Sequence, residues 1–226
     1  MRRSANQLQI STRAARGGFT VLELCFGIIV TSLVMLAVAS FSLAMGTAWR
    51  RSSELESLTL RARQAGARVA REIRDGKLIT TFRAGSLDGS APAAGVMIWK
   101  EDTNGDGKIQ GAELELIEHN TGAHQLTIYR AGQGNNTIVL AWAAVSDPAV
   151  ISNFKIGRTG VPLARGVYGA LFNASATTST TQQPTLEYAL KLVYEPPTSS
   201  VVETSTTGSY TEYGTAAVRA PLPKPS

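Results

Sequence analysis

The sequence contains one cysteine, two histidines and only 17% charged residues. The scarcity of cysteine and histidine argues against disulfides and transition-metal sites. Its single cysteine, Cys25, excludes an internal disulfide and any zinc site built on cysteines. The two histidines, His119 and His124, are five residues apart with no cysteine nearby, so they do not predict a transition-metal site and are expected at the surface or at strand ends. No G-x-S-x-G, nucleotide-binding glycine loop or H-E-x-x-H occurs, so the sequence predicts a protein that is not an enzyme.

Acidic residues are absent from the first 18 residues, which hold four arginines: Arg2, Arg3, Arg13 and Arg16. The formal net charge of the 226-residue chain is +5, and these arginines supply four of those five charges. The basic isoelectric point, near 9.6, therefore reflects an N-terminal segment that resembles a targeting element. Nucleic acid is not the expected partner, because the remaining charges of the two signs almost cancel.

A long apolar run follows this segment. Residues 19–49 contain one charged side chain, Glu23, and the stretch Leu24–Trp49 contains none. As a helix, that stretch would measure about 39 Å, which exceeds the roughly 30 Å hydrocarbon core of a bilayer. It is also longer than the apolar part of a secretory signal peptide. The sequence predicts a single membrane-spanning helix with its arginine-rich N-terminus in the cytoplasm.

The junction between these segments reads Gly17-Gly18-Phe19-Thr20-Val21-Leu22-Glu23. With the basic leader and the apolar helix, it resembles the processing site of type IV prepilins and type II secretion pseudopilins. The resemblance implies that a prepilin peptidase cuts between Gly18 and Phe19, that Phe19 is then N-methylated, and that Glu23 meets the new amine of a neighbouring subunit during assembly. A carboxylate there can offset a cation placed among packed apolar helices.

The helical pattern continues beyond the apolar run through residues 50–75. One apolar stripe has helical spacing, and Asp75-Gly76 is a stop signal. The stripe comprises Leu55, Leu58, Ala62, Ala65, Val69 and Ile73. Arginines from Arg61 to Arg74 occupy the other faces and are expected to be solvated. Their pattern resembles the end of the long helix in J-type minor pseudopilins and W-type minor pilins.

Residues 76–226 predict a β-rich globular head. Short runs rich in branched and aromatic residues are separated by turn signals, and no alternation of strands with helices occurs. The expected strands are Gly95–Lys100, Leu114–His119, Gln125–Arg130, Thr137–Val145, Ile151–Gly157, Val167–Asn173, Leu186–Tyr194 and Tyr210–Arg219. Glu113, Glu115 and Glu118 are expected on the solvent side. The fold class is α+β, and the resemblance implies a pilin-like fold with the long N-terminal helix packed on an antiparallel sheet.

A calcium-loop pattern lies between two of these strands. Residues 102–113 fit the twelve-position loop D-x-[DN]-x-[DN]-G-x₅-E at every defined place. The expected ligands are Asp102, Asn104, Asp106, the Lys108 carbonyl, Gln110 directly or through water, and Glu113. The expected role of calcium is structural. An Asn-Gly and Asp-Gly turn without metal is the alternative interpretation, since such dipeptides form hairpins alone.

Together these features predict a structural subunit rather than a catalyst. The resemblance implies a minor pseudopilin or minor pilin of the bacterial inner membrane, with an extracytoplasmic head that enters a pseudopilus or pilus. Its expected partners are prepilin peptidase, other pilin or pseudopilin subunits, the inner-membrane assembly platform and membrane lipid. The alternatives are a membrane-anchored calcium-binding adhesin or sensor, and a DNA-uptake pilin.

Overall fold

The computed structural model describes residues 18–90, 94–130, 139–140, 145–175, 184–193 and 208–219. The chain forms two compact units, Met1–Trp49 and Arg50–Ser226. One helix, α1 (Val21–Arg74), contributes to both and confirms the long N-terminal helix. The expected leader, apart from Gly18, lies outside the described residues, as does most of the expected strand Thr137–Val145.

The part of α1 in the first unit is an isolated apolar helix. Its large side chains are exposed along its whole length, from Val21 at 80% to Trp49 at 72%. Among the described residues, α1 is the one helix long and apolar enough to cross a membrane, with a mean hydropathy of 2.5 over its most apolar window. Because so large an exposed apolar surface is unfavourable in water, this helix is a candidate membrane span.

The second unit contains the end of α1 and the head. Its other elements are β1 (Leu78–Arg83), β2 (Gly85–Ser86), β3 (Gly95–Trp99), β4 (Ile109–Gln110), the 3-10 turn η1 (Gly111–Glu113), β5 (Leu114–Asn120), β6 (Gln125–Tyr129), β7 (Val139–Leu140), α2 (Pro148–Lys155), β8 (Val161–Arg165), β9 (Val167–Ala174), β10 (Thr185–Val193) and β11 (Ser209–Ala217). The described strands pair antiparallel, in three sheets with the orders β1-β3-β5-β6-β8, β11-β10-β9-β2 and β4-β7. The fold is therefore α+β.

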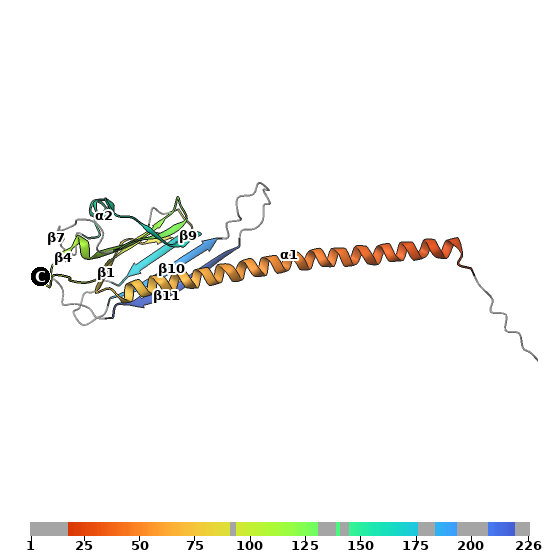
Figure 1. The fold of residues 1–226 in the computed structure, drawn as a ribbon, viewed down its shortest axis with the longest axis horizontal. Helices are drawn as coiled ribbons and strands as arrows, with labels where there is room; N and C mark the ends of the chain where they lie inside the picture. Colours follow the sequence, from red (N-terminus) through yellow and green to blue (C-terminus); the bar gives the residue numbers. More distant parts are fainter. Residues whose placement is uncertain are drawn as a thin grey trace, which may run out of the picture. The chain divides into compact units, whose positions relative to one another are not determined.

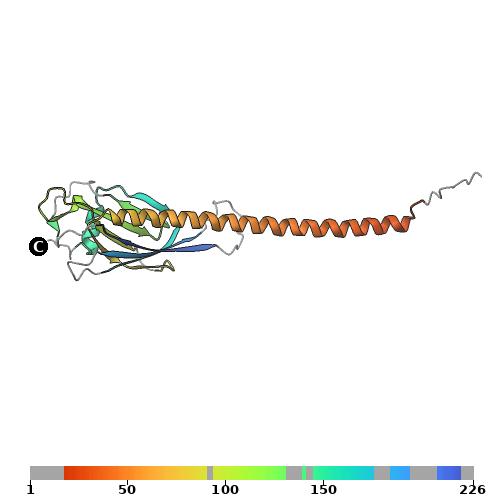
Figure 2. The ribbon, with the colours of Figure 1, turned by 90° about the horizontal axis from the view of Figure 1, so that it is seen from below.

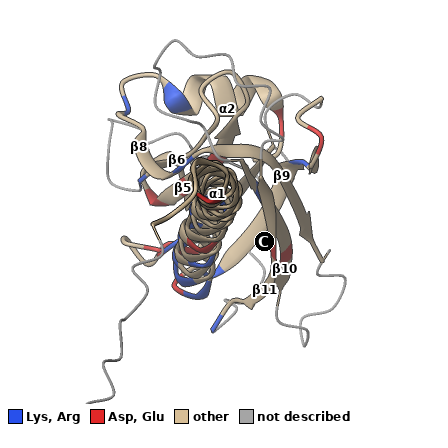
Figure 3. Cartoon of the chain, turned by 90° about the vertical axis from the view of Figure 1, so that its right-hand side faces the viewer, with Lys and Arg blue, Asp and Glu red and all other residues tan. Residues whose placement is uncertain are grey.

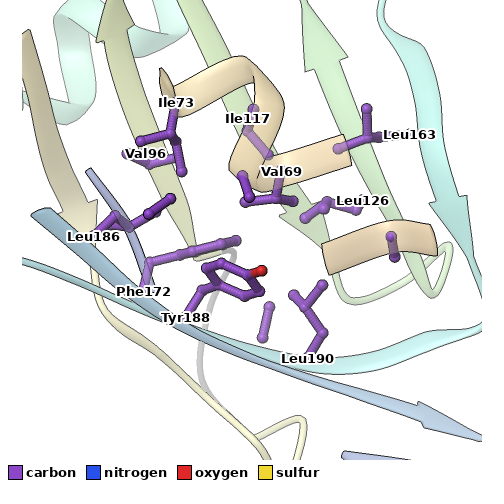
Figure 4. Close-up of a cluster of buried hydrophobic side chains, with 14 of the residues drawn as sticks. Val69, Ile73, Val96, Ile117, Leu126, Leu163, Phe172, Leu186, Tyr188 and Leu190 are labelled. Carbon is purple, nitrogen blue, oxygen red and sulfur yellow. The ribbon is translucent and has the colours of Figure 1, made fainter. Parts of the chain in front are cut away.

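The end of α1 packs against both larger sheets, and Figures 1 and 2 show it alongside β10 and β11. In Figure 4, Val69 and Ile73 of α1 lie among side chains of β3, β5 and β6 on one side and of β9 and β10 on the other. Tyr188 of β10 reaches the helix, where its hydroxyl donates to the Gly66 carbonyl at 3.0 Å. Each large apolar side chain buried here contributes about 1.5–3 kcal/mol to stability.

The five-stranded sheet is covered on its other face as well. Along β3, Val96 and Ile98 belong to the cluster under α1, whereas Met97 and Trp99 belong to a second cluster with Ile151 and Phe154 of α2. Successive side chains of a strand point to opposite faces, so all five residues of β3 are buried. Trp99 is a core residue, 1% exposed.

The structure corrects one predicted strand and one predicted position in α1. Ile151–Gly157 was expected as a strand, but Pro148–Lys155 forms a helix, α2. Asp147 caps α2 by accepting from the Ala149 N–H at 2.8 Å, and Pro148 follows at the first helical position. Leu55 was expected in the buried stripe of α1 but is 48% exposed.

Candidate functional site

The expected processing junction lies at the N-terminal end of α1. Gly18 and Phe19 precede the helix and are exposed. Thr20 and Glu23 then form a reciprocal capping box: the Thr20 N–H donates to Glu23 Oε2 at 3.1 Å, and the Glu23 N–H donates to Thr20 Oγ1 at 3.3 Å. The sequence signal for this box is T-x-x-E, from Thr20 to Glu23. Glu23 therefore has a local structural role besides the expected one in assembly.

The predicted calcium loop has a turn that positions its first carboxylate. Asp102 Oδ2 accepts from the Gly107 N–H at 2.9 Å. Gly107 has φ of +70°, which a residue with a side chain rarely adopts, so the sixth place of the loop requires glycine. Asp102 Oδ1 is buried and has no hydrogen-bond partner among the described residues. An orphaned carboxylate oxygen of this kind fits a missing cation.

The middle of the loop is held by its own polar side chains. Asp106 Oδ1 accepts from the Lys108 N–H at 2.8 Å, and Asp106 Oδ2 accepts from Asn104 Nδ2 at 2.9 Å and from Gln110 Nε2 at 3.4 Å. The hydrogen bond from Lys108 is the largest cause of the lowered pKa of Asp106. These contacts bring Asn104, Asp106 and Gln110 together.

Glu113, the expected last ligand, is instead surrounded by donors of the protein. Its Oε1 accepts from the Thr103 N–H and hydroxyl at 2.8 and 3.0 Å. Its Oε2 accepts from Trp99 Nε1 at 3.1 Å and from the Gln110 N–H at 3.2 Å. In the described part of the chain, no three acidic, histidine or cysteine side chains gather as a metal site. Among the expected ligands, Asp102 therefore has one oxygen without a hydrogen-bond partner, whereas both oxygens of Glu113 are engaged.

Glu113 and Glu115 were expected on the solvent side, and this is wrong, because both are 2% exposed. Glu115 belongs to a polar cluster that joins α1 to the five-stranded sheet. Lys100 Nζ lies 2.9 Å from Glu72 Oε2 of α1 and 3.4 Å from Glu115 Oε1 of β5, and Arg130 Nη2 lies 3.4 Å from Glu72 Oε1.

The two carboxylates of this cluster respond differently to burial. Burial raises the pKa of Glu115 to about 7, and the charge of Lys100 offsets part of that rise. Burial acts on Glu72 in the same direction, but the hydrogen bond and charge of Lys100, with the charge of Arg130, bring its pKa below the usual value. No local motif announces this cluster, because its members come from separate segments.

Arg158 and His119 are two further buried side chains that can carry a positive charge. Arg158 donates to the carbonyls of Gly111 at 2.7 Å, Arg130 at 3.0 Å and Leu114 at 3.5 Å, and it lies 3.7 Å from the ring centre of Phe154. Burial lowers its pKa. His119, expected at the surface or at a strand end, lies near the end of β5 but is buried: it is 1% exposed, its Nε2 lies 2.8 Å from the Val167 carbonyl oxygen, and burial lowers its pKa.

Comparisons of the chain with protein-family models, curated proteins and solved structures found no match. The long apolar helix followed by antiparallel sheets is compatible with a pilin-like architecture.

Proposed function

We propose that the chain is a structural subunit, a minor pseudopilin or minor pilin, made as a precursor and assembled into a type II secretion pseudopilus or a type IV pilus. The observation that carries the proposal is the junction at Gly18 and Phe19, exposed at the start of an apolar helix that continues into the head. An exposed junction suits proteolysis, and the apolar helix suits storage in a bilayer before packing with other helices.

The proposed mechanism assigns the assembly step to Glu23. Prepilin peptidase cuts between Gly18 and Phe19, and the new amine of Phe19 places a positive charge at the edge of an apolar helix. The Glu23 carboxylate of one subunit then pairs with the amine of its neighbour, which sets the axial register of the two helices. The head stays outside the cytoplasm, and the inner-membrane assembly platform moves the subunit out of the lipid.

Mass spectrometry of the mature N-terminus tests the processing step. The expected terminus is N-methylated Phe19, and a chain that keeps Met1 would contradict the proposal. The membrane-anchored adhesin or sensor predicts that second outcome, since its helix stays in the bilayer unprocessed.

Two substitutions separate the assembly role of Glu23 from its capping role. Glu23→Gln keeps an acceptor for the Thr20 N–H but removes the charge, whereas Thr20→Val removes the hydroxyl half of the capping box and keeps the charge. We expect Glu23→Gln to be processed yet to enter filaments poorly, and Thr20→Val to enter them well. Equal incorporation of Glu23→Gln and the unsubstituted chain would refute the assembly role.

Calcium binding by the loop at residues 102–113 is proposed as a structural aid to the head, and the orphaned Asp102 Oδ1 favours it. Asp102, Asn104 and Asp106 would hold the ion, which would neutralise their carboxylates. A site saturated a hundredfold above its dissociation constant adds about 2.7 kcal/mol of stability. In a domain of this size, that raises the melting temperature by about 5–10 °C.

The test uses a truncated chain that begins at Arg50, since both buried clusters lie within residues 58–218. Calcium should raise its melting temperature, and Asp102→Asn should abolish the rise. Asp88→Asn, an exposed aspartate in a separate turn, is the matched control and should leave the rise intact. An unsubstituted chain that melts at the same temperature with calcium and with a chelator would reject the site.

A further inference from the structure

A cationic hollow lies between α1 and β8, apart from the junction and the calcium loop. Its volume is about 280 Å³. It is lined by Arg61, Gln64, Ala65, Arg68, Leu163, Ala164 and Arg165. Three of these seven residues are arginines and none is acidic, so the hollow concentrates positive charge over a partly apolar floor.

The arginines are arranged to hold more than one carboxylate. Arg61 and Arg68 are seven residues apart, which places them on one face of α1 about 10 Å apart along its axis. Arg68 Nη1 donates to the Leu163 carbonyl at 2.8 Å, which fixes the guanidinium against β8. Arg165 stands at the end of β8, an edge strand of its sheet. Among the described residues, no acidic side chain forms an ion pair with any of these three arginines.

We propose that this hollow, which we call the arginine hollow, binds carboxylate side chains of a different, acidic subunit that lies next to this chain in the filament. This inference rests on the proposed function. Guanidinium groups pair with carboxylates through two parallel hydrogen bonds, and partial exclusion of water strengthens each pair. Two arginines about 10 Å apart suit an acidic helix that carries carboxylates at the same interval.

The charge of α1 disfavours a second copy of this chain as the occupant. The start of its head segment, residues 50–68, carries five arginines against two glutamates, Glu54 and Glu56. A second copy alongside would therefore bring like charges together. Nucleic acid is disfavoured too, because Figure 3 shows Lys and Arg interspersed with Asp and Glu over the head rather than in a continuous basic stripe.

The test measures binding of a labelled helical peptide to the full-length chain in neutral detergent micelles by fluorescence anisotropy. One peptide carries glutamates seven residues apart, and its matched partner carries glutamines at the same places. We expect the glutamate peptide to bind at least tenfold more tightly, with an affinity that falls as salt is added. Equal binding of the two peptides would overturn the proposal.

Substitutions then locate the binding. Arg61→Ala should weaken binding of the glutamate peptide at least fivefold, as should Arg68→Ala. Arg63→Ala is the matched control, because Arg63 is exposed on the same helix but does not line the hollow. An equal loss in Arg63→Ala would overturn the proposal by showing general charge attraction. If Arg68→Ala disturbs β8 and lowers the melting temperature, Arg61→Ala still decides, because the Arg61 side chain is exposed and makes no hydrogen bond or ion pair within the described part of the chain.

Three further outcomes would assign the arginine hollow to another occupant and so overturn the proposal. Vesicles of anionic lipid could displace the glutamate peptide, duplex DNA could displace it, or the chain could associate with itself. Each effect would count only if Arg61→Ala abolished it. The result is independent of processing. Peptide binding by a chain that keeps Met1 in the cell would support the arginine hollow while the proposed function fails, and a processed chain without peptide binding would show the reverse.

Discussion

Replacing Glu113 by glutamine tests whether its carboxylate holds the head together without metal. The side chain is 2% exposed, and its two oxygens accept four hydrogen bonds from Trp99, Thr103 and Gln110. Glutamine has nearly the same shape, but its NH₂ group cannot accept. With the NH₂ group turned toward Thr103, the Thr103 hydroxyl can rotate to accept from it, so one donor, the Thr103 N–H, then faces another donor.

The expected loss follows from that one donor. A donor left without an acceptor costs about 1–3 kcal/mol, so Glu113→Gln should lower the stability of the head by about that amount. That is a large share of the roughly 5–15 kcal/mol typical of a domain. The melting temperature should fall by at least about 2 °C.

The assay is thermal unfolding of the chain beginning at Arg50, followed by circular dichroism in the presence of a chelator. Glu101→Gln is the control, because Glu101 is exposed and should change stability by less than about 0.5 kcal/mol. The chelator is what makes the result decisive. If Glu113 served only as a calcium ligand, its substitution would leave the metal-free chain unchanged, and that result would refute the structural role.

Two other predictions concern buried polar side chains of the head. Tyr188→Phe removes the hydroxyl that donates to the Gly66 carbonyl and should cost about 1–2 kcal/mol in urea unfolding; no change would mean that the contact between β10 and α1 is carried by the ring alone. His119 has a lowered pKa because of its burial, so the fold favours its neutral form. Its contribution to stability should therefore be complete above about pH 6.5, the ordinary pKa, and should be lost as the pH falls through the folded-state pKa. His119→Gln should flatten that dependence, and an unchanged slope would contradict it.

The sequence predicted the long helix because its signals are local. Uncharged residues along 24–49 and the apolar spacing from Leu58 to Ile73 each define a helix without knowledge of the rest of the chain. The helix α2 also had a local signal, Asp147-Pro148 before an apolar pair, Ile151 and Phe154, at a spacing of three. Branched residues in the segment Ile151–Gly157 suggested a strand, but the cap at Asp147 starts a helix instead.

The burial of Glu115 and His119 could not be predicted in the same way. An alternating pattern indicates a solvent side only when one face of the sheet is open. Here α1 covers one face of the five-stranded sheet and α2 helps to cover the other. Glu115 is accommodated because Lys100 lies beside it, and His119 because the Val167 carbonyl accepts from it. Both partners come from other segments, so only the tertiary structure reveals them.

The calcium loop shows within one motif that a sequence pattern does not reveal the hydrogen-bond partners of a side chain. The twelve-position pattern names Glu113 as a ligand, but four hydrogen bonds already hold that carboxylate. A calcium ion bound by Glu113 would have to replace some of them, so the Trp99 indole N–H should lose its acceptor and exchange faster with solvent. A calcium ion bound by Asp102, Asn104 and Asp106 alone would leave that indole signal unchanged. Indole N–H exchange followed by NMR during a calcium titration therefore distinguishes the two ligand sets, and unchanged or slower exchange of Trp99 would contradict participation of Glu113.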